Sequence, residues 1–131
     1  MILIVGGSCQ GKAEFARSLL RKRGYEEASS GKEADGMTDS WQQAFEKTCL
    51  LNLHGFLRQV LEAGQDMDGF IRQILNAMPE AVTMDEVGCG IVPVEKRDRD
   101  YREAVGRAGQ SLAAEAAEVY RMVCGVPVRI K

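Results

Sequence analysis

Hydrophobic residues in this chain fall into two kinds of pattern, short unbroken runs and runs of helical spacing. The short runs are bounded by glycine or polar residues and predict strands at residues 2–5, 48–53, 81–84, 119–124 and 126–130. Apolar residues recurring every three or four positions predict helices at residues 12–23, 41–45, 55–63 and 67–78, and a long helix from about residue 96 whose apolar side reaches Val119. Residues 24–38 show no apolar periodicity, which predicts a surface loop. The alternation of strands and helices predicts a three-layer α/β fold with a mostly parallel sheet.

The first predicted strand runs directly into a glycine-rich loop. Gly6, four intervening residues, Gly11 and Lys12 reproduce the spacing G-x-x-x-x-G-K of a phosphate-binding loop (P-loop). In such a loop backbone N–H groups and a helix N-terminus surround an anion, and the lysine reaches the outer phosphates. The residues expected to bind the phosphates of ATP or GTP are Gly6, Gly7, Ser8, Cys9, Gln10, Gly11, Lys12 and Ala13. The fold is therefore expected to be P-loop NTPase-like, with Lys12 as a catalytic residue, although an ordinary strand-to-helix turn would have the same spacing.

Two positions depart from the magnesium-binding pattern of such proteins. Ala13 stands where a serine or threonine hydroxyl usually binds Mg²⁺, and Asn52 stands where an aspartate usually ends a neighbouring strand. We therefore expect a weakened Mg²⁺ site. Asp85 and Glu86, at the end of the strand at 81–84, are the candidate metal ligands, and Glu86 is also a candidate catalytic residue. Both could instead be ordinary solvated acids, and Asn52 could simply cap the helix that follows it.

Composition limits the possible functions. The chain has 131 residues, 45% hydrophobic and 27% charged, which fits one globular domain over residues 1–131. A net charge of −2 gives no general attraction to nucleic acid or to anionic membranes. No apolar run is long enough to span a bilayer and the N-terminus lacks a signal-peptide pattern, so we expect a cytoplasmic protein.

The cysteines and the single histidine give weaker signals. The four cysteines form no C-x-x-C pair, which predicts free thiols rather than a zinc site or a disulfide framework. Cys9 is a candidate reactive thiol, because it lies in an anion-binding loop before a helix N-terminus. A lone histidine at a strand end, here His54, is more typical of a structural or surface residue than of a catalyst.

The C-terminal third carries unusual motifs. Residues 86–93 read E-V-G-C-G-I-V-P, residues 99–106 read R-D-Y-R-E-A-V-G with Gln110 after them, and the chain ends with G-V-P at 125–127 and Lys131. Together with the opening loop, these segments resemble the adenosylcobinamide kinase and adenosylcobinamide-phosphate guanylyltransferase family. The resemblance covers about residues 1–23 and 82–131, and it identifies the chain as a short, divergent member.

The resemblance implies a role in cobalamin (vitamin B12) biosynthesis. Members of this family phosphorylate a hydroxyl of adenosylcobinamide and then transfer GMP from GTP to that phosphate through a guanylylated histidine. Adenosylcobinamide or its phosphate is thus the implied small-molecule substrate. The resemblance also implies a homo-oligomer, commonly a trimer.

Several positions of this chain differ from the family pattern. The nucleophilic histidine of the family precedes the strand that ends at Asn52, but residues 13–53 contain no histidine. Because a nucleophile must be present before it can be guanylylated, we expect the guanylyltransferase activity to be absent. The remaining differences are Ala13 for the loop hydroxyl, Asn52 for the acid, Asp85 for an asparagine, Glu103 for an aspartate and Gly109 for an asparagine.

The sequence therefore leaves three hypotheses for the function. The first is a nucleotide-dependent kinase of cobinamide type. The second is a non-catalytic nucleotide-binding relative that acts as a sensor or as a partner subunit. The third is an unrelated kinase of a small metabolite that shares only the P-loop, but this would leave the C-terminal motifs unexplained.

Overall fold

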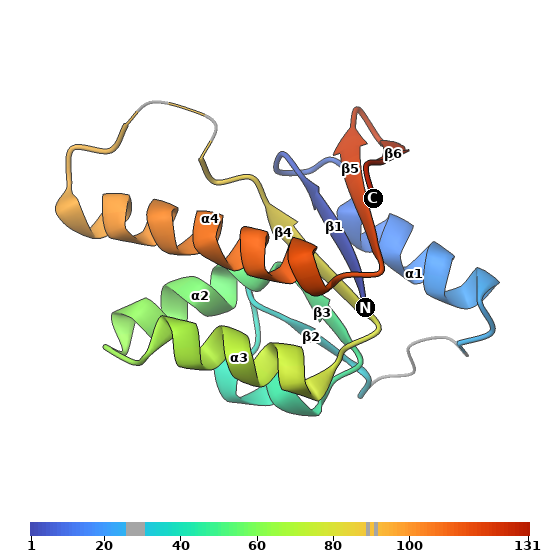
Figure 1. Cartoon of the computed structure of the whole chain (residues 1–131), viewed down its shortest axis with the longest axis horizontal. Helices are drawn as coiled ribbons and strands as arrows, with labels where there is room; N and C mark the ends of the chain where they lie inside the picture. The colour runs from blue at the N-terminus through green and yellow to red at the C-terminus, as the bar shows by residue number, and fades with distance from the viewer. Residues whose placement is uncertain (26–30, 89, 91) are drawn as a thin grey trace.

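The sheet has six strands, five of them parallel. In the computed structural model, which describes residues 1–25, 31–88, 90 and 92–131, the strands follow the order β2-β3-β4-β1-β5-β6 (Figure 1). The strands are β1 (Ile2–Gly6), β2 (Glu33–Asp35), β3 (Cys49–Leu51), β4 (Ala81–Asp85), β5 (Glu118–Val123) and β6 (Val126–Arg129). Only β6 runs antiparallel to its neighbour. The predicted α/β fold with a mostly parallel sheet is confirmed.

Helices cover both faces of this sheet. They are α1 (Lys12–Lys22), the 3₁₀ helix η1 (Trp41–Glu46), α2 (Leu53–Glu62), α3 (Met67–Ala77) and α4 (Lys96–Glu115). Figure 1 shows α1 on one side of the sheet and α2, α3 and α4 on the other. Strand β1 is buried between these layers, with Leu3 facing the core under α2 to α4 and Ile2 and Ile4 facing the core under α1. A strand buried on both faces reads as a continuous apolar run, which is why the sequence showed it clearly.

The structure corrects several predicted element boundaries. Residues 33–35, predicted as loop, form the edge strand β2 beside β3. This strand has three residues and a single buried side chain, Ala34, so it carries no periodic signal. The long helix ends at Glu115, and Val119 belongs to β5 instead. The predicted short helix is a 3₁₀ helix, and α2 begins two residues earlier than predicted. Residues 26–30 of the predicted loop lie outside the described residues, as do Cys89 and Ile91 of the C-terminal motif.

The parallel strands bring the glycine-rich loop after β1 and the acidic residues at the end of β4 to the same edge of the sheet. Strand β4 lies directly beside β1, in a register that pairs Gly6 with Asp85. The backbone N–H of Glu86 then donates to the Gly6 oxygen, 3.0 Å away. A Cβ on Gly6 would lie 2.8 Å from the Met122 oxygen of β5, so only glycine fits where the loop leaves the sheet.

The end of β2 touches the first turn of α2 at two glycines. A Cβ on Gly36 would lie 2.3 Å from the Asn52 oxygen, and one on Gly55 would lie 2.4 Å from the Gly36 oxygen. The Gly36 N–H also donates to the Leu51 oxygen at 2.9 Å. Because neither position has a side chain, the two backbones can touch, and this fixes the end of β2 next to the end of β3.

No helix among the described residues is long and apolar enough to cross a membrane.

Candidate nucleotide-binding site

The glycine-rich loop joins β1 to α1 at the carboxyl edge of the sheet. Gly11 has φ of 80° and Cys9 has φ of 57°, so the loop turns twice through left-handed backbone. Gly11 is the N-cap residue of α1, and no side chain caps this helix within the described part of the chain. The first N–H groups of α1 are therefore left for another acceptor. A helix start of this kind, preceded by a glycine-rich loop, is suited to an anion.

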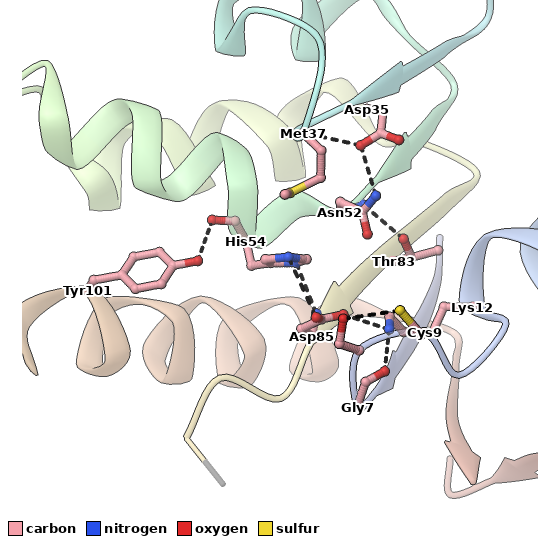
Figure 2. A network of polar contacts seen from close by, with 11 residues as sticks. Gly7, Cys9, Lys12, Asp35, Met37, Asn52, His54, Thr83, Asp85 and Tyr101 are labelled. Carbon is pink, nitrogen blue, oxygen red and sulfur yellow. Dashed lines mark hydrogen bonds and ion pairs between the residues drawn. The ribbon is translucent and has the colours of Figure 1, made fainter. Parts of the chain in front are cut away.

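Lys12 is buried at the first position of α1. Its side chain is 5% exposed, and its Nζ lies 2.6 Å from Asp85 Oδ1 and 2.6 Å from the Gly7 oxygen, to which it donates (Figure 2). Removing an ammonium group from water is costly unless it is paired and hydrogen-bonded. Asp85 and the Gly7 carbonyl satisfy that requirement in this structure.

His54 approaches the same carboxylate from α2. Its Nδ1 accepts a hydrogen bond from the backbone N–H of Asp85 at 3.1 Å, and its Nε2 lies 3.7 Å from Asp85 Oδ2. Burial lowers the pKa of His54, which Asp85 partly counteracts and Lys12 reinforces. The neutral ring therefore carries its proton on Nε2, because Nδ1 must be an acceptor. In this arrangement neither ring nitrogen offers a free lone pair for nucleophilic attack.

Tyr101 of α4 holds the beginning of α2 in place. Its hydroxyl donates to the His54 backbone oxygen at 2.8 Å, and the guanidinium of Arg58 lies 4.2 Å from the centre of its ring. Burial raises the pKa of Tyr101, so the hydroxyl stays protonated and remains a donor. The ring position of His54 thus depends on α4 as well as on α2.

Asn52 lies at the end of β3, where its side chain bonds to the end of β2. It occupies the N-cap position of α2, but its amide makes no capping hydrogen bond. Instead, Nδ2 donates to Asp35 Oδ1 at 2.8 Å, and the backbone N–H of Asn52 donates to Thr83 Oγ1 at 2.9 Å. Asn52 is therefore the N-cap residue of α2 by position, as the sequence suggested, but it does not cap the helix through its side chain, whose NH₂ group is held by the charged acceptor Asp35.

A cavity of about 400 Å³ lies over the loop. Its lining residues come from the loop and the start of α1, from the turn after β2, from the ends of β3 and β4, and from the first turn of α2. They are Ser8, Cys9, Gln10, Gly11, Lys12, Ala13, Glu14, Met37, Asn52, His54 and Asp85. The structure thus brings most of the predicted loop residues together with Asp85. Gly6 is buried beneath the loop, and Gly7 takes part through its carbonyl.

The two candidate acids lie in different surroundings. Asp85 faces Lys12, whereas the carboxylate of Glu86 lies 3.1 Å from Nε of Arg121 on β5. A second hollow, of about 330 Å³ between the sheet and α4, is lined by both acids, whereas only Asp85 lines the cavity over the loop. Among the described residues there is no group of three or more histidine, cysteine or acidic side chains that could hold a metal ion.

Sequence reasoning did not identify Asp35 or Met37 as part of the site. Both lie in the segment predicted as loop. Because β2 pairs with β3, Met37 lines the cavity and Asp35 bonds to Asn52, which lines it. The one available signal was the D-G pair at residues 35–36, which is typical of a turn after a strand. Gln10 has a structural role that the sequence also did not suggest, since its Oε1 accepts from the Cys124 N–H at 2.5 Å and ties the loop to the β5–β6 turn.

Known proteins resemble this chain over part or most of its length. The model of the family described as "Cobinamide kinase / cobinamide phosphate guanyltransferase" matches residues 21–130. A protein of Escherichia coli (strain K12) named "Bifunctional adenosylcobalamin biosynthesis protein CobU" is 49% identical over 47 residues, which are 36% of this chain and 26% of that protein. The protein of the same name from Salmonella typhimurium has the same identity and coverage. The matched stretch is thus about a quarter of the length of these curated relatives.

Proposed function

This chain belongs to the cobinamide kinase / cobinamide phosphate guanyltransferase family, and we propose that it binds ATP or GTP through the loop at residues 6–13 and transfers a phosphoryl group to a cobinamide-type acceptor. The family match begins at residue 21, after the loop. The nucleotide site is therefore argued from the geometry of the loop, and the acceptor from the family.

The observation that carries the proposal is the ion pair between the buried Lys12 and the partly buried Asp85, both of which line the cavity. A lysine that is 5% exposed needs an anionic partner, and it lies where a helix N-terminus also favours one. A polyphosphate entering the cavity would offer Lys12 a second anionic partner. Lys12 would then stabilise charge on the transferred phosphoryl group, in a reaction that depends mainly on positioning and electrostatics.

The oxygen atoms in the cavity suit Mg²⁺, the metal that such a reaction uses. Asp85 and Asn52 both line it, and the bond from Asn52 Nδ2 to Asp35 leaves the side-chain oxygen of Asn52 available. Mg²⁺ prefers one or two protein oxygens together with phosphates and water. When bound, Mg²⁺ would neutralise charge on the phosphate oxygens. Ala13 supplies no hydroxyl, so we propose a weakened metal site in which Asp85, rather than Glu86, is the carboxylate next to the phosphates.

We also propose that guanylyl transfer is absent. His54 is the only histidine in the chain. Its Nδ1 is occupied by the Asp85 N–H, and Nε2 carries the proton of the neutral ring. A guanylylated histidine would therefore require a ring that first gives up this hydrogen bond.

Calorimetric titration with ATP and with GTP tests the nucleotide site. We expect Lys12→Ala to lose at least about tenfold in affinity for the preferred nucleotide, since a charge-assisted contact to phosphate is worth more than about 1.4 kcal/mol. Lys22→Ala, at the exposed end of the same helix, is the matched control and should bind as wild type does. Equal affinities for wild type and Lys12→Ala would overturn the proposal.

Single-turnover phosphorylation of cobinamide then separates the two acids. Asp85→Asn should slow the reaction by at least about tenfold, because it removes the carboxylate beside Lys12. Glu86→Gln should have a smaller effect, because that carboxylate is paired with Arg121. The reverse order would return the catalytic role to Glu86, as the sequence predicted.

A non-catalytic sensor or partner subunit is the second candidate function. It is favoured by Ala13, which removes a metal-binding hydroxyl, and by the engagement of Asp85 with Lys12. The same calorimetry distinguishes the two functions. Nucleotide affinity that does not respond to Mg²⁺, together with no phosphorylated product in the single-turnover assay, would favour the sensor.

A further inference from the structure

Asp35 lies behind Asn52, at the end of the edge strand β2. Its Oδ1 accepts two hydrogen bonds, from Asn52 Nδ2 at 2.8 Å and from the Met37 N–H at 2.9 Å. The Asp35 N–H is itself bonded to Asp39 Oδ2 at 2.8 Å, so the backbone on both sides of this carboxylate is held. Figure 2 shows Asp35 and Asn52 on the side of the network opposite Lys12 and Asp85.

The charge of Asp35 decides which way the Asn52 amide faces. An ionised carboxylate only accepts hydrogen bonds, so the NH₂ end of the amide must turn toward it and the carbonyl end must turn away. Because Nδ2 is the Asn52 atom bonded to Asp35, the other end of the amide, Oδ1, faces away from that carboxylate. Within the described part of the chain no group donates a hydrogen bond to this oxygen, although Asn52 lines the cavity over the loop.

The backbone at Asn52 is held as firmly as the side chain. Asn52 has φ of 51°, a left-handed conformation that asparagine tolerates better than most residues. Its N–H is bonded to the fully buried Thr83, and its carbonyl lies under Gly36 at the contact with α2. A rotation of the whole residue would break these contacts, so the amide orientation is set by Asp35.

We propose that Asp35 is a positioning residue, which presents the Asn52 carbonyl oxygen to the divalent cation that accompanies the nucleotide. The inference rests on the proposed function. Asn52 replaces a carboxylate in this role with a neutral oxygen, and Asp35 ensures that this oxygen, rather than the NH₂ group, faces the cation. An amide in the opposite orientation would place two N–H donors in the cavity and would repel the cation.

The experiment measures nucleotide affinity by calorimetry, once in EDTA and once in Mg²⁺, using the nucleotide that wild type prefers. The ratio of the two affinities reports the contribution of the cation without requiring catalysis. Asp35→Ala should reduce this ratio by about tenfold or more, the usual size of effect when a group that orients a metal ligand is lost. Its affinity in EDTA should stay within about threefold of wild type, because the loop and Lys12 are unchanged.

Three further variants separate positioning from a general effect. Asp35→Asn keeps an oxygen that can accept from Asn52 but loses the charge and adds NH₂ donors, so both amide orientations become possible and the ratio should fall between those of wild type and Asp35→Ala. Glu33→Ala removes another carboxylate of β2, one that is bonded to Arg17 outside the cavity, and should leave the ratio unchanged. Asn52→Gly removes the amide and fits the left-handed backbone, so it should lower the ratio as Asp35→Ala does.

The double variant Asp35→Ala with Asn52→Gly completes the cycle. If Asp35 acts through Asn52, the double variant should have the ratio of Asn52→Gly alone. Additive losses, or an unchanged ratio in Asp35→Ala or Asn52→Gly, would overturn the inference while leaving nucleotide binding intact. A wild-type ratio of one, meaning that Mg²⁺ does not change the nucleotide affinity, would also overturn the inference. No nucleotide binding by wild type in either buffer would overturn the proposed function, and this inference with it.

Discussion

At the scale of single residues, the site is organised by one residue, Asp85, that contacts two partners. Asp85 takes the Lys12 ammonium on its side chain and the His54 ring on its backbone N–H. These contacts bring a cation, an anion and a neutral imidazole together at the end of β4. The sequence indicated Lys12 through its loop spacing and Asp85 through its position after a strand. His54 carried no such signal, since it reaches Asp85 from the first turn of α2.

His54 leads to a prediction about pH. Because burial lowers its pKa from the usual value of 6.5, the unfolded chain binds more protons than the folded one between the folded pKa and 6.5. The stability that the neutral His54 ring contributes is therefore complete above pH 6.5. It decreases as the pH falls from 6.5 toward the pKa of His54 in the folded protein. Chemical denaturation of the metal-free protein should give a lower free energy of unfolding at about pH 5.5 than at about pH 7.5. This decrease should be larger for wild type than for His54→Gln. An NMR titration midpoint above the usual value would contradict this.

At the scale of elements, the site depends on how closely β2 and α2 approach each other. Gly36 and Gly55 touch through their backbones, and this contact places Asp35 beside Asn52. Neither glycine needs a positive φ for this purpose, because the limiting factor is the space for a Cβ. A three-residue edge strand is thereby held in a position that its own pairing with β3 would fix only weakly.

The substitution Gly55→Ala tests this contact. Its Cβ would lie 2.4 Å from the Gly36 oxygen, a backbone atom that cannot swing aside. We expect a loss of about 1–3 kcal/mol in the free energy of unfolding, the usual cost of overpacking. Gly106→Ala on α4 is the matched control, because nothing lies within 4 Å of its Cβ and alanine favours helix by about 1 kcal/mol. Denaturant titrations that rank the two variants the other way would contradict the close packing of β2 on α2.

At the scale of the whole molecule, the cysteines report on both the core and the site. Cys49 lies in the core between the sheet and α1, and burial raises the pKa of its thiol to about 12. Cys9 and Cys124 are exposed at the loop edge of the sheet. The rate at which a cysteine reacts depends on its thiolate concentration and on its accessibility. Cys49 can therefore serve as a buried reference, and Cys9 as an exposed probe beside the proposed nucleotide.

Mass spectrometry after timed alkylation should show this difference. In native protein we expect Cys9 and Cys124 to be modified rapidly, and Cys49 only at the rate at which the chain unfolds. Saturating nucleotide should slow the modification of Cys9, which lines the cavity, more than that of Cys124. Equal protection of the two exposed thiols would indicate a general stabilisation instead of occupancy of the loop.

Much of the architecture could be predicted from the sequence because its signals are local. The apolar run before Gly6, the glycine and lysine spacing of the loop, and the periodic faces of α2, α3 and α4 each depend on residues close together in the chain. These signals predicted the α/β class, the loop and its lysine, and the C-terminal motifs indicated the family. They did not predict β2, whose three residues have one buried side chain, or the end of α4 before β5.

Only the tertiary structure decided which polar groups meet. The order of strands places β4, and not β3, beside β1, so Lys12 pairs with Asp85 while Asn52 is turned to Asp35. The sequence placed Asp85 and Glu86 together as candidate ligands, but adjacent residues at a strand end point in different directions, and Glu86 faces Arg121. Asp35, Asn52 and His54 come from separate segments, and their contacts follow from strand order and helix packing. Local pattern determines most of the elements, whereas the chemistry of a site depends on distances between segments that the pattern does not contain.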